Sequence, residues 1–165
     1  SDDNPVYRKA RPVPLSNREK YVAALDKLER DGVIEKVTHS EWASPTVTVE
    51  KPGGGLRICG DYSSTINVHS TCEQYPLPTL EELLHKLGPG EKFTKLDLSQ
   101  AYHQLEVAPE CRKYTTINTI QGLYQYKRLP FGFHSAVSIF QRVMEETLCD
   151  LPGSGGYIDD VLCTS

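Results

Sequence analysis

The chain has 165 residues, of which 38% are hydrophobic and 24% are charged, and its formal net charge is -4. This length and apolar content suit one domain, or one domain with a lobe, and they exclude a chain that is disordered throughout. The negative net charge argues against a protein that coats nucleic acid over its whole surface. No apolar run approaches the roughly 20 residues of a membrane span, and the N-terminus lacks a signal-peptide pattern, so we expect an intracellular protein that makes no contact with membranes.

The cysteines form an odd set without a close pair, which indicates reduced thiols rather than a disulfide framework. They are Cys59, Cys72, Cys111, Cys149 and Cys163. The alternative is a zinc site, for which Cys59, His69 and Cys72 are the nearest cluster. Their spacing does not match a recognised pattern of zinc ligands.

The first 15 residues contain three prolines and three basic side chains, which predicts an extended basic arm. Such an arm could contact a phosphate backbone or lie over the surface as a solvated leader, and the sequence leaves both interpretations open. Ser16 and Glu19 then form a capping box, and apolar residues follow on one helical face until Asp31-Gly32. We therefore predict an amphipathic helix after the arm.

Residues 33–37 are typical of a short strand, and the loop at 39–45 contains Trp42, which we expect to be a packing anchor. Residues 46–50 and 56–59 alternate like two strands of a hairpin, and three glycines in their connection allow positive φ angles. Lys51 and Arg57 flank this flexible tip. They are either a clamp for phosphate groups or charged residues that protect a sheet edge.

A second capping box, Thr79 with Glu82, predicts a helix whose buried face is formed by leucines. These are Leu80, Leu83, Leu84 and Leu87. Residues 93–98 then alternate like an inner strand, and Asp97 lies near its end, just before a turn at 99–102. A buried carboxylate is costly unless it is paired, so Asp97 needs a partner.

Two further β-like runs, 113–119 and 123–128, predict another hairpin. Apolar residues at helical spacing over 134–148 predict a helix with Phe140 and Met144 in the core. The chain then reaches Tyr157-Ile158-Asp159-Asp160-Val161-Leu162, two adjacent acids in a hairpin turn between β-formers. This is either ordinary turn chemistry or part of a divalent-cation site for which Asp97 supplies the third acid.

Taken in order, short motifs along nearly the whole chain resemble the successive blocks of a reverse transcriptase, and most of all those of Gypsy-type retrotransposon polymerases and gene remnants derived from them. The blocks are residues 51–57, Asp61-Tyr62, Tyr75-Pro76-Leu77-Pro78, Lys95-Leu96-Asp97-Leu98, Gln100-Ala101-Tyr102-His103-Gln104, Gly122-Leu123-Tyr124, Arg128-Leu129-Pro130-Phe131-Gly132, Phe140-Gln141-Arg142 and Tyr157-Ile158-Asp159-Asp160. Two positions depart from the family pattern: Ser63 stands where a basic residue is common, and Val137 where proline is usual.

The resemblance implies an α+β fold, the fingers and an incomplete palm of a right-hand polymerase, built from mixed helices and antiparallel hairpins. The fingers would comprise 1–73 and 105–134, and the palm 74–104 and 135–165. Since thumb, connection and RNase H have no counterpart here, we expect the isolated chain to polymerise weakly or not at all. The alternatives are a domesticated, non-catalytic fragment that binds nucleic acid or protein, and a soluble α+β domain with a chance acidic turn.

The resemblance also implies a reaction, an RNA-directed DNA polymerase that transfers nucleotides from dNTP to a primer 3′-hydroxyl with two Mg²⁺ ions, or Mn²⁺. Asp97 and Asp159 would be the main catalytic metal ligands, Asp160 an accessory one, and the Leu98 carbonyl a further one. The residues expected at the dNTP are Lys51 and Arg57 at the triphosphate, the backbone of Leu98, Ser99, Gln100 and Ala101, Tyr102 as the steric gate against ribose, and Phe131 and Gly132 in the pocket wall. Tyr102 as a core aromatic and Phe131 as an apolar wedge are the alternatives for those two.

By the same resemblance, the partners would be an RNA or DNA template with its primer, dNTP, and the remaining polymerase subdomains and RNase H of a longer polyprotein. The compartment would be the cytoplasm, a virus-like particle or the nucleus.

Overall fold

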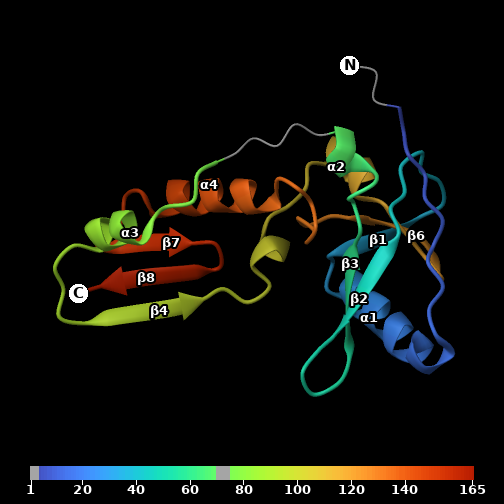
Figure 1. Ribbon diagram of the computed structural model, residues 1–165, viewed down its shortest axis with the longest axis horizontal. Coiled ribbons are helices and arrows are strands. Elements are labelled where there is room, and N and C mark those ends of the chain that lie inside the picture. The colour runs from blue at the N-terminus through green and yellow to red at the C-terminus, as the bar shows by residue number, and fades with distance from the viewer. Residues whose placement is uncertain (1–3, 70–74) are drawn as a thin grey trace. The chain divides into compact units, whose positions relative to one another are not determined.

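The computed structural model describes residues 4–69 and 75–165, and its contacts divide the chain into two compact units (Figure 1). The first unit comprises Ser1–Thr71 and Tyr102–His134, and the second comprises Cys72–Ala101 and Ser135–Ser165. Both combine helices with antiparallel strands, so the predicted α+β class is confirmed. Within the described ranges, no helix has the length and apolar character needed to cross a bilayer.

The first unit is built around a three-stranded sheet and a separate hairpin. The sheet has the order β1-β6-β5, and the hairpin pairs β2 with β3. Its elements are η1 (Leu15–Asn17), α1 (Arg18–Arg30), β1 (Ile34–Val37), β2 (Thr46–Glu50), β3 (Leu56–Gly60), α2 (Ile66–His69), η3 (Pro109–Thr115), β5 (Ile117–Thr119) and β6 (Gly122–Tyr126). A short helix, η2 (Ala101–Gln104), lies where the chain passes in sequence from the second unit to the first.

Aromatic side chains dominate the core of the first unit. Tyr21, Tyr62 and Tyr126 are each at most 2% exposed. Trp42 is 4% exposed, and the centroid of its ring lies 5.5 Å from that of Tyr114. The Tyr62 hydroxyl donates a hydrogen bond to the Thr115 carbonyl at 2.8 Å, so this polar group is satisfied inside the core. The prediction that Trp42 is a packing residue is confirmed.

The second unit is a three-stranded antiparallel sheet with two helices against one of its strands. Its elements are α3 (Leu80–Leu87), β4 (Phe93–Asp97), α4 (Ala136–Leu148), β7 (Ser154–Tyr157) and β8 (Asp160–Thr164). Figure 1 shows β8 between β4 and β7, which is the order of the hydrogen-bonded ladder. Both α3 and α4 pack against β7.

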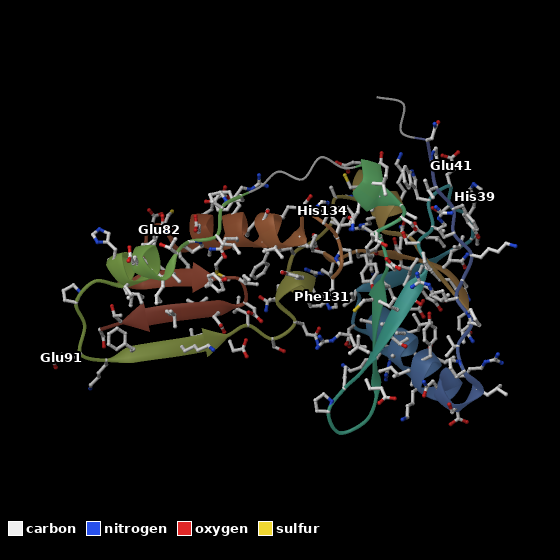
Figure 2. The ribbon with its side chains drawn as sticks, viewed as in Figure 1. His39, Glu41, Glu82, Glu91, Phe131 and His134 are labelled. Atoms are coloured by element: carbon white, nitrogen blue, oxygen red, sulfur yellow. The ribbon has the colours of Figure 1, made fainter. Side chains whose placement is uncertain are left out.

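Most of the predicted elements are present, but two of the local predictions differ from the structure. Ser16 lies in η1, and α1 begins after Asn17 without a side-chain cap, so the first capping box is not formed. The second one is formed: Thr79 and Glu82, the latter labelled in Figure 2, bond reciprocally at the start of α3. The run at 113–119 is a strand only from Ile117, because the residues before it form η3.

Burial on α3 and β4 also differs from the expectation. On α3, Leu83 and Leu87 are buried, whereas Leu80 and Leu84 are 71% and 55% exposed. The whole of β4 is exposed, because it is an edge strand of this sheet, with β8 as its one neighbour among the described strands. The prediction of an inner strand with a buried Asp97 is therefore wrong.

The basic arm contacts other segments of the first unit. Tyr7 forms an isolated parallel β-bridge with Ala43, and the Arg11 guanidinium forms an ion pair with the Asp61 carboxylate at 2.5 Å. The thiols of Cys59, Cys111, Cys149 and Cys163 are free. The alternative zinc site would consist of Cys59, His69 and Cys72, and of these, Cys72 and the side chain of His69 lie outside the described residues.

Candidate functional site

The acidic turn connects β7 to β8. Tyr157 pairs with Asp160 across the hairpin, which leaves Ile158 and Asp159 as the two turn residues. Ile158 has a φ of 53°, a left-handed conformation that is costly for a β-branched residue. Asp159 therefore lies at the tip of the hairpin, while Asp160 is already the first residue of β8.

Strand pairing brings the third acid to this turn. β4 is antiparallel to β8, and its last residue, Asp97, is the direct partner of Asp160. The next residue, Leu98, donates its backbone N–H to the Asp159 carbonyl at 2.8 Å. Two backbone connections thus hold the end of β4 against the turn.

The three carboxylates form a compact cluster. Each of Asp97, Asp159 and Asp160 offers an oxygen, and these oxygens all lie within 4.8 Å of one another. Asp97 and Asp159 are exposed and Asp160 is half-buried. Carboxylate oxygens are the ligands that Mg²⁺, Mn²⁺ and Ca²⁺ prefer, so the chemistry of this donor set fits a hard divalent cation.

Lys95, to which the sequence motifs assign no role, lies beside the cluster. The Lys95 ammonium is 3.4 Å from Asp160 Oδ2, and its side chain is 62% exposed. The position of Lys95 two residues before Asp97 could have predicted this proximity, because residues two apart on a strand share a face. Lys95 offsets part of the repulsion between the acids.

The chain turns immediately after β4. Ser99 and Gln100 form the turn, Gln100 has a φ of 52°, and Ala101 is buried at the start of η2. Residues 98–101 thus leave β4 through a tight, partly left-handed turn.

The other predicted nucleotide residues belong to the first unit, and four aromatic and basic groups meet there. The ring of Phe131, labelled in Figure 2, lies with its centroid 4.8 Å from that of Tyr102 and 5.2 Å from that of His103. The Arg57 guanidinium lies 5.7 Å from the same Phe131 centroid, within range of a cation–π contact. Phe131 is thus the common neighbour of Tyr102, His103 and Arg57.

Burial differs within this aromatic cluster. Tyr102 is only 9% exposed, while Arg57 is exposed near the tip of the β2–β3 hairpin. Burial, and secondarily the positive charge of Arg57, lowers the pKa of His103. A neutral His103 is therefore favoured between Phe131 and Tyr126.

The remaining two predicted residues have structural roles that are visible in the backbone. Lys51 is exposed at the start of the hairpin connection, where its N–H donates to the Gly55 carbonyl at 3.0 Å. Gly132 has a φ of 86°, and a Cβ at this position would lie 2.7 Å from the Gly60 carbonyl oxygen. Only glycine fits there without displacement of the backbone.

Gln141 is a second residue to which the sequence motifs assign no role. Gln141 on α4 is 0% exposed, and its side chain bonds to the backbone on both sides of Tyr157. The available signal was its position between the core residues Phe140 and Met144, because a polar side chain on a buried helical face must find partners.

Comparison with known proteins gives one family. Residues 50–165 match the family described as reverse transcriptase (RNA-dependent DNA polymerase). The chain is 36% identical over 163 residues to an uncharacterized protein of Caenorhabditis elegans, covering 98% of this chain and 13% of that protein. It is 33% identical over 172 residues to the retrovirus-related Pol polyprotein from transposon gypsy of Drosophila melanogaster, covering 99% of this chain and 16% of that polyprotein.

Solved structures agree on the fold. The foamy viral protease-reverse transcriptase in complex with an RNA/DNA hybrid superimposes with a TM-score of 0.83 at 21% identity, covering 99% of this chain and 21% of that one. The same protein in complex with double-stranded DNA gives 0.83 at 22% identity, covering 98% and 33%. The chain thus spans a small part of the proteins that it matches.

Proposed function

Because the chain belongs to the reverse transcriptase (RNA-dependent DNA polymerase) family, we propose that it supplies catalytic residues to an RNA-directed DNA polymerase. The observation that carries this proposal is the convergence of Asp97, Asp159 and Asp160. The reaction is nucleotidyl transfer from dNTP to a primer 3′-hydroxyl. The similarity to the gypsy Pol polyprotein supports a retrotransposon origin.

Asp97, Asp159 and Asp160 would hold two Mg²⁺ ions, with Mn²⁺ as a substitute, and the Leu98 carbonyl would be a further ligand. When bound, such ions stabilise the attacking and leaving oxygens of an in-line displacement. The chain's own contribution is rigidity. The pairing of Asp97 with Asp160 fixes these two acids at strand ends, and the bond from Leu98 to the Asp159 carbonyl holds Asp159 in the two-residue turn beside them.

The residues of the first unit would bind the incoming nucleotide. Lys51 and Arg57 would contact the triphosphate, and Tyr102 would exclude a 2′-hydroxyl at the sugar. Phe131 would support the Tyr102 ring, and Gly132 would allow a close approach of the backbone. The contacts that Phe131 makes with both Tyr102 and Arg57 support a common role for these side chains.

The backbone of residues 98–101 would form a cradle for phosphate groups. The turn at Ser99 and Gln100 supports this role, because consecutive N–H groups in a turn with a left-handed residue form an anion-binding concavity.

The first unit would correspond to the fingers of a polymerase and the second to part of the palm. The contact boundaries at residues 71, 101 and 134 lie within a few residues of those expected from the resemblance. The partners would be a primed template, dNTP, and further subdomains including RNase H. Foamy viral relatives of the same fold, solved with double-stranded DNA and with an RNA/DNA hybrid, support nucleic acid as the partner.

The test is Mg²⁺-dependent primer extension on an RNA template, made with the longest natural polypeptide that carries these residues. Asp159→Asn is the test variant, and Asp150→Asn, which removes an exposed acid after α4, is the matched control. We expect Asp159→Asn to lose at least about a hundredfold in kcat, while Asp150→Asn extends like the wild type. Equal extension by Asp159→Asn would refute the role of the acids, and binding of primed template without extension by the wild type would favour a binding fragment.

A further inference from the structure

Gln141 is a fully buried polar side chain that faces the catalytic hairpin. It lies on α4 and is 0% exposed, with Phe140 and Met144 buried beside it at 3% and 7%. An amide in such surroundings costs free energy unless its donor and acceptor are both used. The partners of Gln141 therefore indicate what the side chain does.

Both ends of the Gln141 amide bond to the backbone of the hairpin. Its Oε1 accepts a hydrogen bond from the Ile158 N–H at 2.8 Å, and its Nε2 donates to the Gly156 carbonyl at 2.9 Å. The Nε2 group is also 3.2 Å from Glu145 Oε1 on the same helix. The two backbone bonds span Tyr157, so they hold the end of β7 at the point where the turn begins.

The bond to Ile158 matters because of the conformation of that residue. A φ of 53° is strained for a β-branched side chain, at a cost of about 1–3 kcal/mol that the surroundings must offset. Asp159 follows directly, and its carbonyl accepts the Leu98 N–H. The direction of the chain at Ile158 therefore decides where the Asp159 carboxylate lies.

We propose that Gln141 is a positioning residue that holds Ile158 in its left-handed conformation and thereby places Asp159 in the acidic cluster. The last step, that the placed carboxylate binds metal, rests on the proposed function. The side-chain hydrogen bonds of Gln141 described above go to the backbone of the hairpin and to Glu145. Its effect on the site passes through Ile158.

The first test needs neither metal nor activity. Hydrogen exchange of the Ile158 amide is measured by NMR in the metal-free chain, for the wild type and for Gln141→Met, which keeps the length of the side chain without its polar atoms. We expect exchange to become about tenfold faster. Thr164→Val is the matched control, because it removes a 2.7 Å bond to the Leu87 carbonyl at the other end of β8. If Gln141→Met does not fold, Gln141→Asn, polar but one methylene shorter, takes its place.

The second test is the affinity of the same variants for Mn²⁺, followed by electron paramagnetic resonance. We expect Gln141→Met to bind about tenfold more weakly, and Ile158→Gly added to it to restore part of the loss, because glycine adopts this φ without strain. Thr164→Val should bind like the wild type. Wild-type exchange or wild-type affinity in Gln141→Met would overturn the positioning role, whereas a wild-type chain that binds no Mn²⁺ would overturn the proposed function instead.

Discussion

Asp97 and Asp160 face each other directly across the antiparallel strands β4 and β8, and Lys95 lies 3.4 Å from the Asp160 carboxylate. Like charges directly opposite each other on a sheet destabilise it, so this pairing is maintained against repulsion. The ammonium of Lys95 relieves part of that repulsion when no cation is bound. A divalent cation would do so more completely.

Lys95 should therefore compete with metal. We expect Lys95→Gln to raise the affinity for Mn²⁺ about two- to threefold, because it removes a nearby positive charge from an exposed site. The measurement is an Mn²⁺ titration at low and at high salt. The difference between the two proteins should shrink at high salt, since screening weakens exposed charge interactions. Weaker Mn²⁺ binding by Lys95→Gln would show that the lysine supports the site instead.

The ring contact between Tyr102 and Phe131 leads to a prediction about sugar selection. We expect Tyr102→Val to raise the incorporation of ribonucleotides relative to deoxyribonucleotides by about tenfold or more. Phe131→Leu should change the ratio in the same direction but less, because it loosens the support of the Tyr102 ring without removing it. The measurement is kcat/KM for both nucleotide classes on one template. An unchanged ratio in Tyr102→Val would leave that residue a core aromatic only.

The depressed pKa of His103 predicts the pH dependence of stability. Burial disfavours the charged imidazole, so below the ordinary value of 6.5 the unfolded chain binds more protons than the folded one. The contribution of neutral His103 to the free energy of unfolding is thus complete above pH 6.5. This contribution is lost as the pH falls through the lower pKa that His103 has in the folded protein. Urea unfolding between pH 7.5 and about 5 measures this decline.

The control for this pH dependence uses two histidine variants. We expect His103→Gln to flatten the decline, while His39→Gln, which removes an exposed histidine of the first unit, should leave it in place. If the free energy of unfolding of His103→Gln still declined at low pH, other titrating groups would be the cause of the decline.

Close packing of β7 against α4 gives a prediction about stability. A Cβ at Gly156 would overlap Cγ of Met144, whereas a Cβ at Gly155 would meet Leu83 Cδ2 at 3.1 Å. We expect Gly156→Ala to lower the free energy of unfolding by about 1–3 kcal/mol, because the middle of a buried side chain must move. Gly155→Ala should cost less, since only the end of Leu83 must shift. Met144→Ala in the Gly156→Ala background should recover part of the loss if this overlap is the cause.

The elements that the sequence predicted well are those set by local chemistry. The β2–β3 hairpin follows from alternating strands around Gly53, Gly54 and Gly55, all of which have positive φ. The start of α3 follows from the capping box of Thr79 with Glu82. Such signals depend on residues that are close in sequence, so they depend less on tertiary context than burial does. They are not sufficient in every case, because the equally local capping box of Ser16 with Glu19 is not formed.

Burial was predicted less well, because it depends on partners that are distant in sequence. Leu80 and Leu84 have the helical spacing of core residues, yet on α3, which packs against β7 and β8, Leu83 and Leu87 are the buried leucines. Asp97 was expected to be buried and is exposed at a sheet edge. Its proximity to Asp159 and Asp160 was inferred from an acid at a strand end, and the structure brings the three together through strand pairing.

Gln141 shows what a sequence pattern cannot supply. Its partners are backbone atoms up to 17 residues away, and no side-chain motif marks them. The left-handed φ of Ile158 was equally hidden, because isoleucine is not a residue that signals such a conformation.

The most direct test of the central claim is whether Asp97, Asp159 and Asp160 bind a divalent cation together. Mn²⁺ is added to the isotope-labelled chain, and paramagnetic broadening of backbone amides is followed by NMR. We expect the earliest and strongest broadening in the second unit at residues 97–98 and 158–160, its reversal by excess Mg²⁺, and its loss in Asp159→Asn but not in Asp150→Asn. Broadening that begins elsewhere, or that persists unchanged in Asp159→Asn, would contradict the assignment of these acids as the metal site.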